Sequence, residues 1–136
     1  MSPKDRKTIL VVDGNILMRQ LLAEALSPGD RYNILMSETG AQALQQSNKF
    51  KGEIHLLLAD FQPTGMTGIE LATAVTIERP QLQVLLISGF PDGMLVLNEG
   101  WHFLPRPFIA SQLRTLVDGL VLPHGKSRFS AVKPLQ

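Results

Sequence analysis

The stretch Ile54-His55-Leu56-Leu57-Leu58-Ala59-Asp60, with Phe61-Gln62-Pro63-Thr64-Gly65-Met66-Thr67-Gly68 behind it, decides the fold of this chain. Residues 54–59 form an almost continuous apolar run, which is typical of a strand buried on both faces of a parallel sheet. The proline and the glycines that follow indicate a loop. Asp60 is therefore predicted to lie at the mouth of the sheet, where a buried strand opens into a loop.

A second acid follows an apolar run in the same way, because Ile9-Leu10-Val11-Val12 leads directly into Asp13. Parallel strands end at the same edge of a sheet. In the flavodoxin-like strand order 2-1-3-4-5, the first and third strands are neighbours where the order reverses, and ligands bind at that point. Asp13 and Asp60 are therefore predicted to share one acidic pocket.

Short apolar runs alternate with amphipathic stretches five times along the chain. This alternation predicts a doubly wound, flavodoxin-like (βα)5 sandwich, in which helices cover both faces of a five-stranded parallel sheet. In the first helix, Leu17, Leu21, Leu22 and Ala25 are expected to face the core. Strands are expected at 8–12, 32–36, 54–59, 82–87 and 101–104, and helices at 15–26, 39–48, 69–78, a shortened fourth at 94–98, and 109–122.

Composition and charge narrow the possible functions. The chain has 136 residues, of which 44% are hydrophobic and 18% charged, as expected for one soluble domain at 1–122. Residues 123–136 hold three basic residues and no acid, and are expected to form a basic, flexible tail or linker. The rest carries ten basic residues against twelve acidic ones, which argues against a nucleic-acid-binding core.

Other function classes are excluded by what the sequence lacks. Without cysteine, the chain has no disulfide and no thiolate chemistry. No apolar run is long enough for a membrane span or a signal peptide, so a cytoplasmic protein with no membrane partner is expected. The three histidines, His55, His102 and His124, are scattered without the spacing of metal ligands.

Four motifs, taken together and in order, resemble the receiver domain of response regulators in two-component signalling. The resemblance covers residues 7–122 and is greatest to the receiver modules of hybrid histidine kinases. The motifs are Ile9-Leu10-Val11-Val12-Asp13, Leu58-Ala59-Asp60 with Gly65-Met66-Thr67-Gly68, Leu85-Leu86-Ile87-Ser88-Gly89, and Leu104-Pro105-Arg106-Pro107-Phe108.

The resemblance implies that Asp60 receives a phosphoryl group from the phosphohistidine of a histidine kinase or a phosphotransfer protein. Transfers of this kind are catalysed mainly by positioning and charge neutralisation. The resemblance also implies a Mg²⁺ ion held by Asp13, Asp60 and the backbone carbonyl of Gln62, since hard dications prefer oxygen ligands.

Three further roles follow from the same resemblance. Ser88 would hydrogen-bond a phosphoryl oxygen, and Phe103 would be the aromatic switch that moves with Ser88. Arg106 would pair with the phosphoryl group, and a cis peptide bond before Pro107 would turn its side chain toward the acids. The chain would then be a regulatory phosphoacceptor module and not an enzyme. Its output would be an unidentified protein partner, with a homodimer as one possibility.

The sequence departs from the family pattern at the site itself. Gly14 stands where the family has a second acid, which predicts weak Mg²⁺ binding. Arg106 replaces the usual lysine, and its planar fork could grip phosphate or bridge Asp13 and Asp60. The proline after the acceptor is displaced to Pro63, and the segment between Ser88 and Arg106 is short.

Two alternatives to the phosphoacceptor remain open at this stage. The departures at the site favour a pseudo-receiver, a protein-binding domain that works without phosphorylation. A small flavin carrier is less favoured, because the loop after Asp13 lacks the hydroxyl- and glycine-rich cradle that a flavin phosphate needs.

Overall fold

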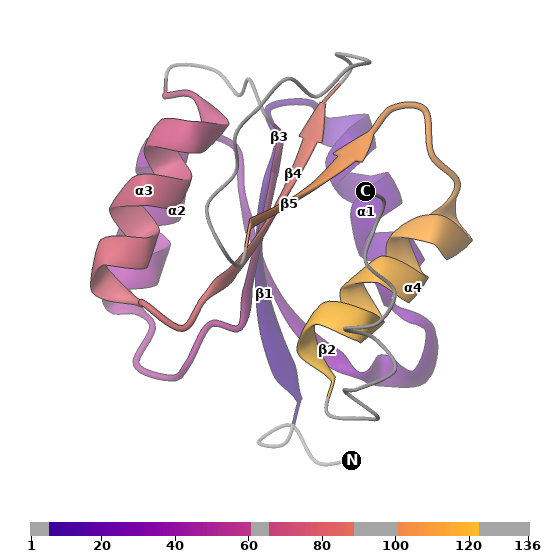
Figure 1. The fold of residues 1–136 in the computed structure, drawn as a ribbon, viewed down its shortest axis with the longest axis horizontal. Helices are drawn as coiled ribbons and strands as arrows, with labels where there is room; N and C mark the ends of the chain where they lie inside the picture. The colour runs from indigo at the N-terminus through magenta and orange to yellow at the C-terminus, as the bar shows by residue number, and fades with distance from the viewer. Residues whose placement is uncertain (1–5, 61–65, 89–100, 123–136) are drawn as a thin grey trace.

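A computed structural model of the chain describes residues 6–60, 66–88 and 101–122. Its five parallel strands form one sheet in the order β2-β1-β3-β4-β5, so the predicted flavodoxin-like fold is confirmed (Figure 1). The strands are β1 (Lys7–Val12), β2 (Tyr32–Ser37), β3 (Leu56–Asp60), β4 (Gln83–Ser88) and β5 (Trp101–Pro105). The helices are α1 (Ile16–Leu26), the short 3-10 helix η2 (Pro28–Asp30), α2 (Gly40–Lys49), α3 (Gly68–Glu78) and α4 (Ala110–Val121).

Helices cover both faces of the sheet, with α1 and α4 on one side and α2 and α3 on the other (Figure 1). Successive residues of each strand point to opposite faces, so β3 sends Leu56 and Leu58 toward α1 and α4, and Leu57 and Ala59 toward α2 and α3. All four are at most 1% exposed. Burial on both faces is the reason that the strands read as continuous apolar runs.

The helix starts agree with the sequence analysis. The side chain of Asn15 caps α1 by accepting a hydrogen bond from the backbone N–H of Met18 at 2.9 Å. Thr39 caps α2 in the same way, at 3.1 Å from the N–H of Gln42. Helix α3 begins at a capping box formed by Thr67 and Glu70.

One predicted helix face is wrong. Leu22 and Ala25 of α1 are buried as expected, but Leu17 is 71% exposed and Leu21 44% exposed. The buried stripe continues through Leu26 and is flanked by the partly buried Met18. The helix is therefore rotated so that Leu17 and Leu21 face outward, beside the end of the sheet.

The structure describes two of the three histidines, each with a hydrogen-bonding partner. The backbone N–H of Thr8 donates to Nδ1 of His55 at 3.0 Å, and Nε2 of His102 is 3.2 Å from Oε1 of Gln83. Residues 6–60, 66–88 and 101–122 contain no group of three His, Cys, Asp or Glu residues that could hold a metal ion. His124 and the predicted turn of helix at 94–98 lie outside the described residues.

Arg79, just after α3, was not singled out by the sequence patterns. Its guanidinium donates hydrogen bonds to both Oγ and the backbone carbonyl of Ser47, at 2.9 and 2.8 Å. It also donates to the carbonyls of Phe50 and Gly52, each at 2.9 Å. One side chain thus satisfies the open end of α2 and the turn behind it, and joins them to the end of α3.

No described helix is long and apolar enough to cross a membrane.

Candidate functional site at the carboxyl edge of the sheet

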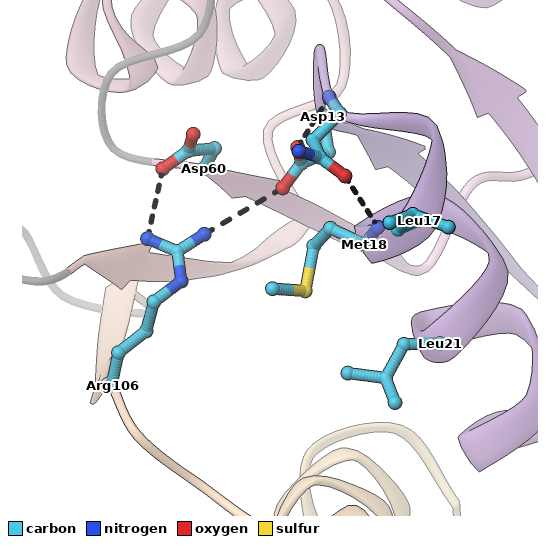
Figure 2. Close-up of a pocket in the computed structure, with 7 residues that line it drawn as sticks. Asp13, Leu17, Met18, Leu21, Asp60 and Arg106 are labelled. Carbon is cyan, nitrogen blue, oxygen red and sulfur yellow. Dashed lines mark hydrogen bonds and ion pairs between the residues drawn. The ribbon is translucent and has the colours of Figure 1, made fainter.

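The pairing of the strands brings the two predicted acids together. Val12 of β1 lies opposite Ala59 of β3, so the residues that follow, Asp13 and Asp60, emerge side by side. Both line one hollow of about 590 Å³, together with Arg106 from the segment after β5 (Figure 2). The position is the reversal of strand order, where the fold predicts a ligand site.

Arg106 lies between the two acids and contacts both. Its Nη1 is 3.5 Å from Oδ1 of Asp60, and its Nη2 is 3.7 Å from Oδ2 of Asp13 (Figure 2). The side chains are exposed to different extents, with 3% for Asp13, 21% for Asp60 and 29% for Arg106. Asp60 is thus the carboxylate that a partner can reach. The peptide bond between Arg106 and Pro107 is cis, as the resemblance implied.

Asp13 is a buried carboxylate that is only partly satisfied. Its Oδ1 accepts a hydrogen bond from the N–H of Asn15 at 2.9 Å, whereas its buried Oδ2 accepts none from the described part of the chain. Burial raises the pKa of Asp13 above its usual range, although the hydrogen bond from Asn15 opposes the shift. Asp60 raises this pKa further, while Arg106 and Arg19 lower it. An oxygen in this setting is a ready ligand for a cation.

Arg19 of α1 is a second cation near the acids that the sequence analysis missed. Its Nη1 donates a hydrogen bond of 2.7 Å to the backbone carbonyl of Asp13. The contact ties the helix to the end of β1 and so fixes the turn that contains Gly14. A separation of six residues across a turn leaves no periodic signal, so only the folded structure reveals this contact.

The hollow above the acids has a charged floor and one apolar wall. The wall comes from Leu17, Met18 and Leu21 of α1, which Figure 2 shows beside the acid pair. Leu17 and Leu21 are the two leucines whose exposure contradicted the predicted core face. Their outward position therefore gives the site an apolar border.

The other predicted site residues are described to different degrees. Ser88 is the last residue of β4, where it pairs with Pro105 of β5. The structure describes its place in the strand but not its side chain. Phe103 is partly buried and packs against the cluster under α2 and α3. Gly14 is exposed in the bend after β1. Gln62 lies outside the described residues, so its predicted role as a metal ligand stays a prediction.

The strain at Asp13 predicts a stabilising substitution. When the pKa of a carboxyl is raised in the folded state, the free energy of unfolding falls as pH rises past the ordinary pKa of 3.8. The protein remains less stable at neutral pH for the same reason. Asparagine keeps an oxygen for the N–H of Asn15 but buries no charge. We therefore expect Asp13→Asn to raise the free energy of unfolding by about 1 kcal/mol at neutral pH, a gain typical of removing such functional strain.

Urea denaturation in metal-free buffer, at neutral pH and near the ordinary pKa, measures this effect. The gain should shrink in acid, where Asp13 is protonated in both states. Asp30→Asn is the matched control, because Asp30 is an exposed acid whose carboxylate pairs with Arg6 at 2.7 Å. An Asp13→Asn variant less stable than wild type at neutral pH would contradict the account of burial given above.

Fold and site together define a class of protein: a doubly wound α/β domain with an acidic pocket at the ends of its first and third strands. The sequence profile of the response regulator receiver domain matches residues 9–118. The chain therefore belongs to the response regulator receiver domain family, and it is a regulatory module of two-component signalling. The resemblance stated from the motifs is confirmed, and a flavin carrier is set aside.

Individual relatives agree with this assignment. The chain is 25% identical over 118 residues to the sensor kinase CckA of Brucella abortus (strain 2308), a match that covers 84% of this chain but only 12% of the kinase. It is 33% identical over 84 residues to the response regulator receiver protein CpdR of the same organism, covering 62% of this chain and 68% of CpdR. The crystal structure of the receiver domain from the hybrid histidine kinase CckA superimposes with a TM-score of 0.73 at 26% identity, covering 84% and 98% of the two chains.

Proposed function

We propose that this receiver domain accepts a phosphoryl group on Asp60 from the phosphohistidine of a histidine kinase or a phosphotransfer protein, and thereby changes its binding to a partner protein. One observation carries the proposal: a partly exposed carboxylate lies 3.5 Å from a guanidinium nitrogen at the reversal of strand order. The pairing gives Asp60 a cation at the point where negative charge would gather during transfer.

The chemistry asked of the chain is simple. An oxygen of the Asp60 carboxylate attacks the phosphorus, a P–O bond forms, and the P–N bond of the phosphohistidine breaks. The electron pair stays on the imidazole nitrogen, which is then free to take a proton from water. Arg106 would turn its N–H groups to the phosphoryl oxygens, an arrangement that arginine makes readily and that stabilises charge in the transition state.

The buried oxygen of Asp13 supports a Mg²⁺ site as part of this proposal. Oδ2 of Asp13 lacks a hydrogen bond within the described residues, and carboxylate oxygens are the ligands that Mg²⁺ prefers. Asp13 and Asp60 would hold the ion, with water and the backbone carbonyl of Gln62. When bound, it would neutralise charge on the transferring group. Gly14 leaves the site one acid short, so we expect weak binding.

The signal would be a population shift between two arrangements of the domain. The hydroxyl of Ser88 would bind a phosphoryl oxygen, and Phe103, only partly buried at the edge strand β5, would change its packing with it. A downstream protein, a second copy of this chain included, would recognise the shifted state. We propose that this exchange takes place in the cytoplasm, where the kinase modules would meet it.

Phosphorylation by a small-molecule phosphodonor, followed by intact mass, tests the proposal. With Mg²⁺ present, wild type should gain the mass of one phosphoryl group and Asp60→Asn should gain none. Asp30→Asn serves as the matched control. Asp30 is an exposed acid in η2, beyond the far end of α1, so this substitution should leave the reaction unchanged. A folded wild type that stays unmodified at every Mg²⁺ concentration would instead favour a phosphorylation-independent binding domain.

A further inference from the structure

We propose that Arg106 and the divalent cation compete for the same two carboxylates, so that Arg106 is a built-in counter-ion which the metal must displace. The inference rests on the proposed function, because it concerns the metal that would assist phosphorylation of Asp60. It goes further in assigning to Arg106 a second role, in setting the metal affinity of the site.

The geometry of the fork carries this inference. Two different nitrogens of one guanidinium lie 3.5 Å from Oδ1 of Asp60 and 3.7 Å from Oδ2 of Asp13. Both oxygens face the guanidinium of Arg106 (Figure 2). A Mg²⁺ ion shared by both acids would need its oxygen ligands at about 2.1 Å. The planar fork therefore already occupies one oxygen of each acid, which a shared ion would otherwise be free to approach.

The contacts are too long for a permanent lock. A charge-assisted N–H···O bond normally measures about 2.7–2.9 Å, well below either contact of Arg106. Oδ2 of Asp13 remains without a hydrogen bond from the described residues, and the pKa of Asp13 stays raised by burial despite the guanidinium. A partly exposed ion pair of this kind contributes little free energy. Arg106 is thus a weak competitor that a dication can displace, leaving the fork free for phosphate.

Simple charge repulsion is the rival explanation, since any nearby cation would weaken Mg²⁺ binding. The two explanations differ in what they predict for lysine. Lysine keeps the positive charge but is a single point, so it cannot span two carboxylates as a fork does. If contact with both acids is what opposes the metal, Arg106→Lys should relieve most of the competition. If net charge alone opposes it, lysine should behave like arginine.

The experiment is a Mg²⁺ titration of the full chain, followed through the backbone amide NMR signal of Asn15, whose N–H bonds to Oδ1 of Asp13. We expect Arg106→Lys to lower the Kd for Mg²⁺ roughly threefold to tenfold, as fits the loss of a weak ion pair, and Arg106→Met to lower it at least as much. Arg31→Lys is the matched control, because Arg31 pairs with Asp118 at 3.1 Å at the opposite end of the strands, and its Kd should not change.

Three results would overturn the inference. If Arg106→Met lowers the Kd for Mg²⁺ but Arg106→Lys does not, charge repulsion alone explains the effect of Arg106. Equal Kd values in all the variants would mean that Arg106 does not compete, and the absence of Mg²⁺ binding in every variant would remove the metal site. The proposed function is judged separately: if Asp60 is phosphorylated while Arg106→Lys binds Mg²⁺ no more tightly, only the competition fails.

Discussion

Replacing Arg106 with methionine should slow phosphorylation of Asp60 about a hundredfold, the cost usually found when one preorganised charge-stabilising donor is removed. The guanidinium lies within 3.5 Å of the Asp60 carboxylate, and methionine has similar length without charge. The same variant is expected to bind Mg²⁺ more tightly. A slower reaction with a better-loaded metal site would separate the two roles of Arg106, because a merely structural role would not move the two measurements in opposite directions.

Initial rates with a small-molecule phosphodonor at saturating Mg²⁺, read by intact mass, measure this effect. Arg106→Lys is the informative control: it keeps the charge, so it should retain most of the rate although it loses the fork. A rate for Arg106→Met close to that of wild type would show that Arg106 makes no contribution to the transfer. The assignment of Asp60 as the acceptor would be untouched by that result.

Arg79→Met should have the largest effect on stability, with a loss of about 3 kcal/mol in the free energy of unfolding, the scale expected when a charged donor leaves several partly buried acceptors unpaired. Arg79 donates four hydrogen bonds of 2.8–2.9 Å, to Ser47 and to the carbonyls of Phe50 and Gly52. Methionine can fill some of the space but can donate to none of these atoms.

Urea denaturation of wild type and of Arg79→Met measures the difference in their free energies of unfolding. Arg114→Met provides the matched control, because Arg114 is also partly buried but its guanidinium donates a hydrogen bond to a single carbonyl among the described residues, that of Ala25 at 3.1 Å. That substitution should cost only about 1 kcal/mol, the value of a single such bond. Equal losses for the two variants would mean that the number of satisfied carbonyls does not determine the cost.

Each buried strand leaves a continuous apolar run, which located the five strands, and their alternation with helices predicted that they are parallel. The order 2-1-3-4-5 came from the flavodoxin-like fold that this alternation indicates, and the structure has the same order. Asp13 and Asp60 could be brought together without coordinates, since residues that end neighbouring parallel strands share one edge. The strand ends themselves shifted by one or two residues: β3 begins at Leu56, although Ile54 is still buried. The backbone of His55 still donates to the carbonyl of Thr8 at 2.9 Å and accepts from the N–H of Gln83 at 3.1 Å, so nothing in the apolar run marks the start of the strand.

The orientation of α1 could not be predicted, because two adjacent stripes of the helix both contain Leu22 and Ala25. One stripe adds Leu17 and Leu21, and the other adds Met18 and Leu26. Both fit a period of 3.6 residues, and only packing against the sheet and α4 selects the second. The leucines left outside became the apolar border of the site, so the error concealed a feature next to the acids.

Contacts made by long side chains were the other gap. Arg19 and Arg79 reach backbone carbonyls, which every residue carries, and so no pairing of residue types marks them in the sequence. For Arg106, the resemblance gave the charge and its pairing with phosphate. It left open whether the fork would bridge the acids, and the distances to Asp13 and Asp60 answer that in favour of a loose bridge.

The buried oxygen of Asp13 also bears on how this sequence has evolved. Asparagine at that position is one nucleotide away in the genetic code and is expected to give a more stable protein. Under selection for folding alone, drift would tend to replace the acid. The stability that Asp13 is expected to cost the folded domain would then be the cost of keeping a charge for the metal and phosphoryl chemistry proposed at Asp60.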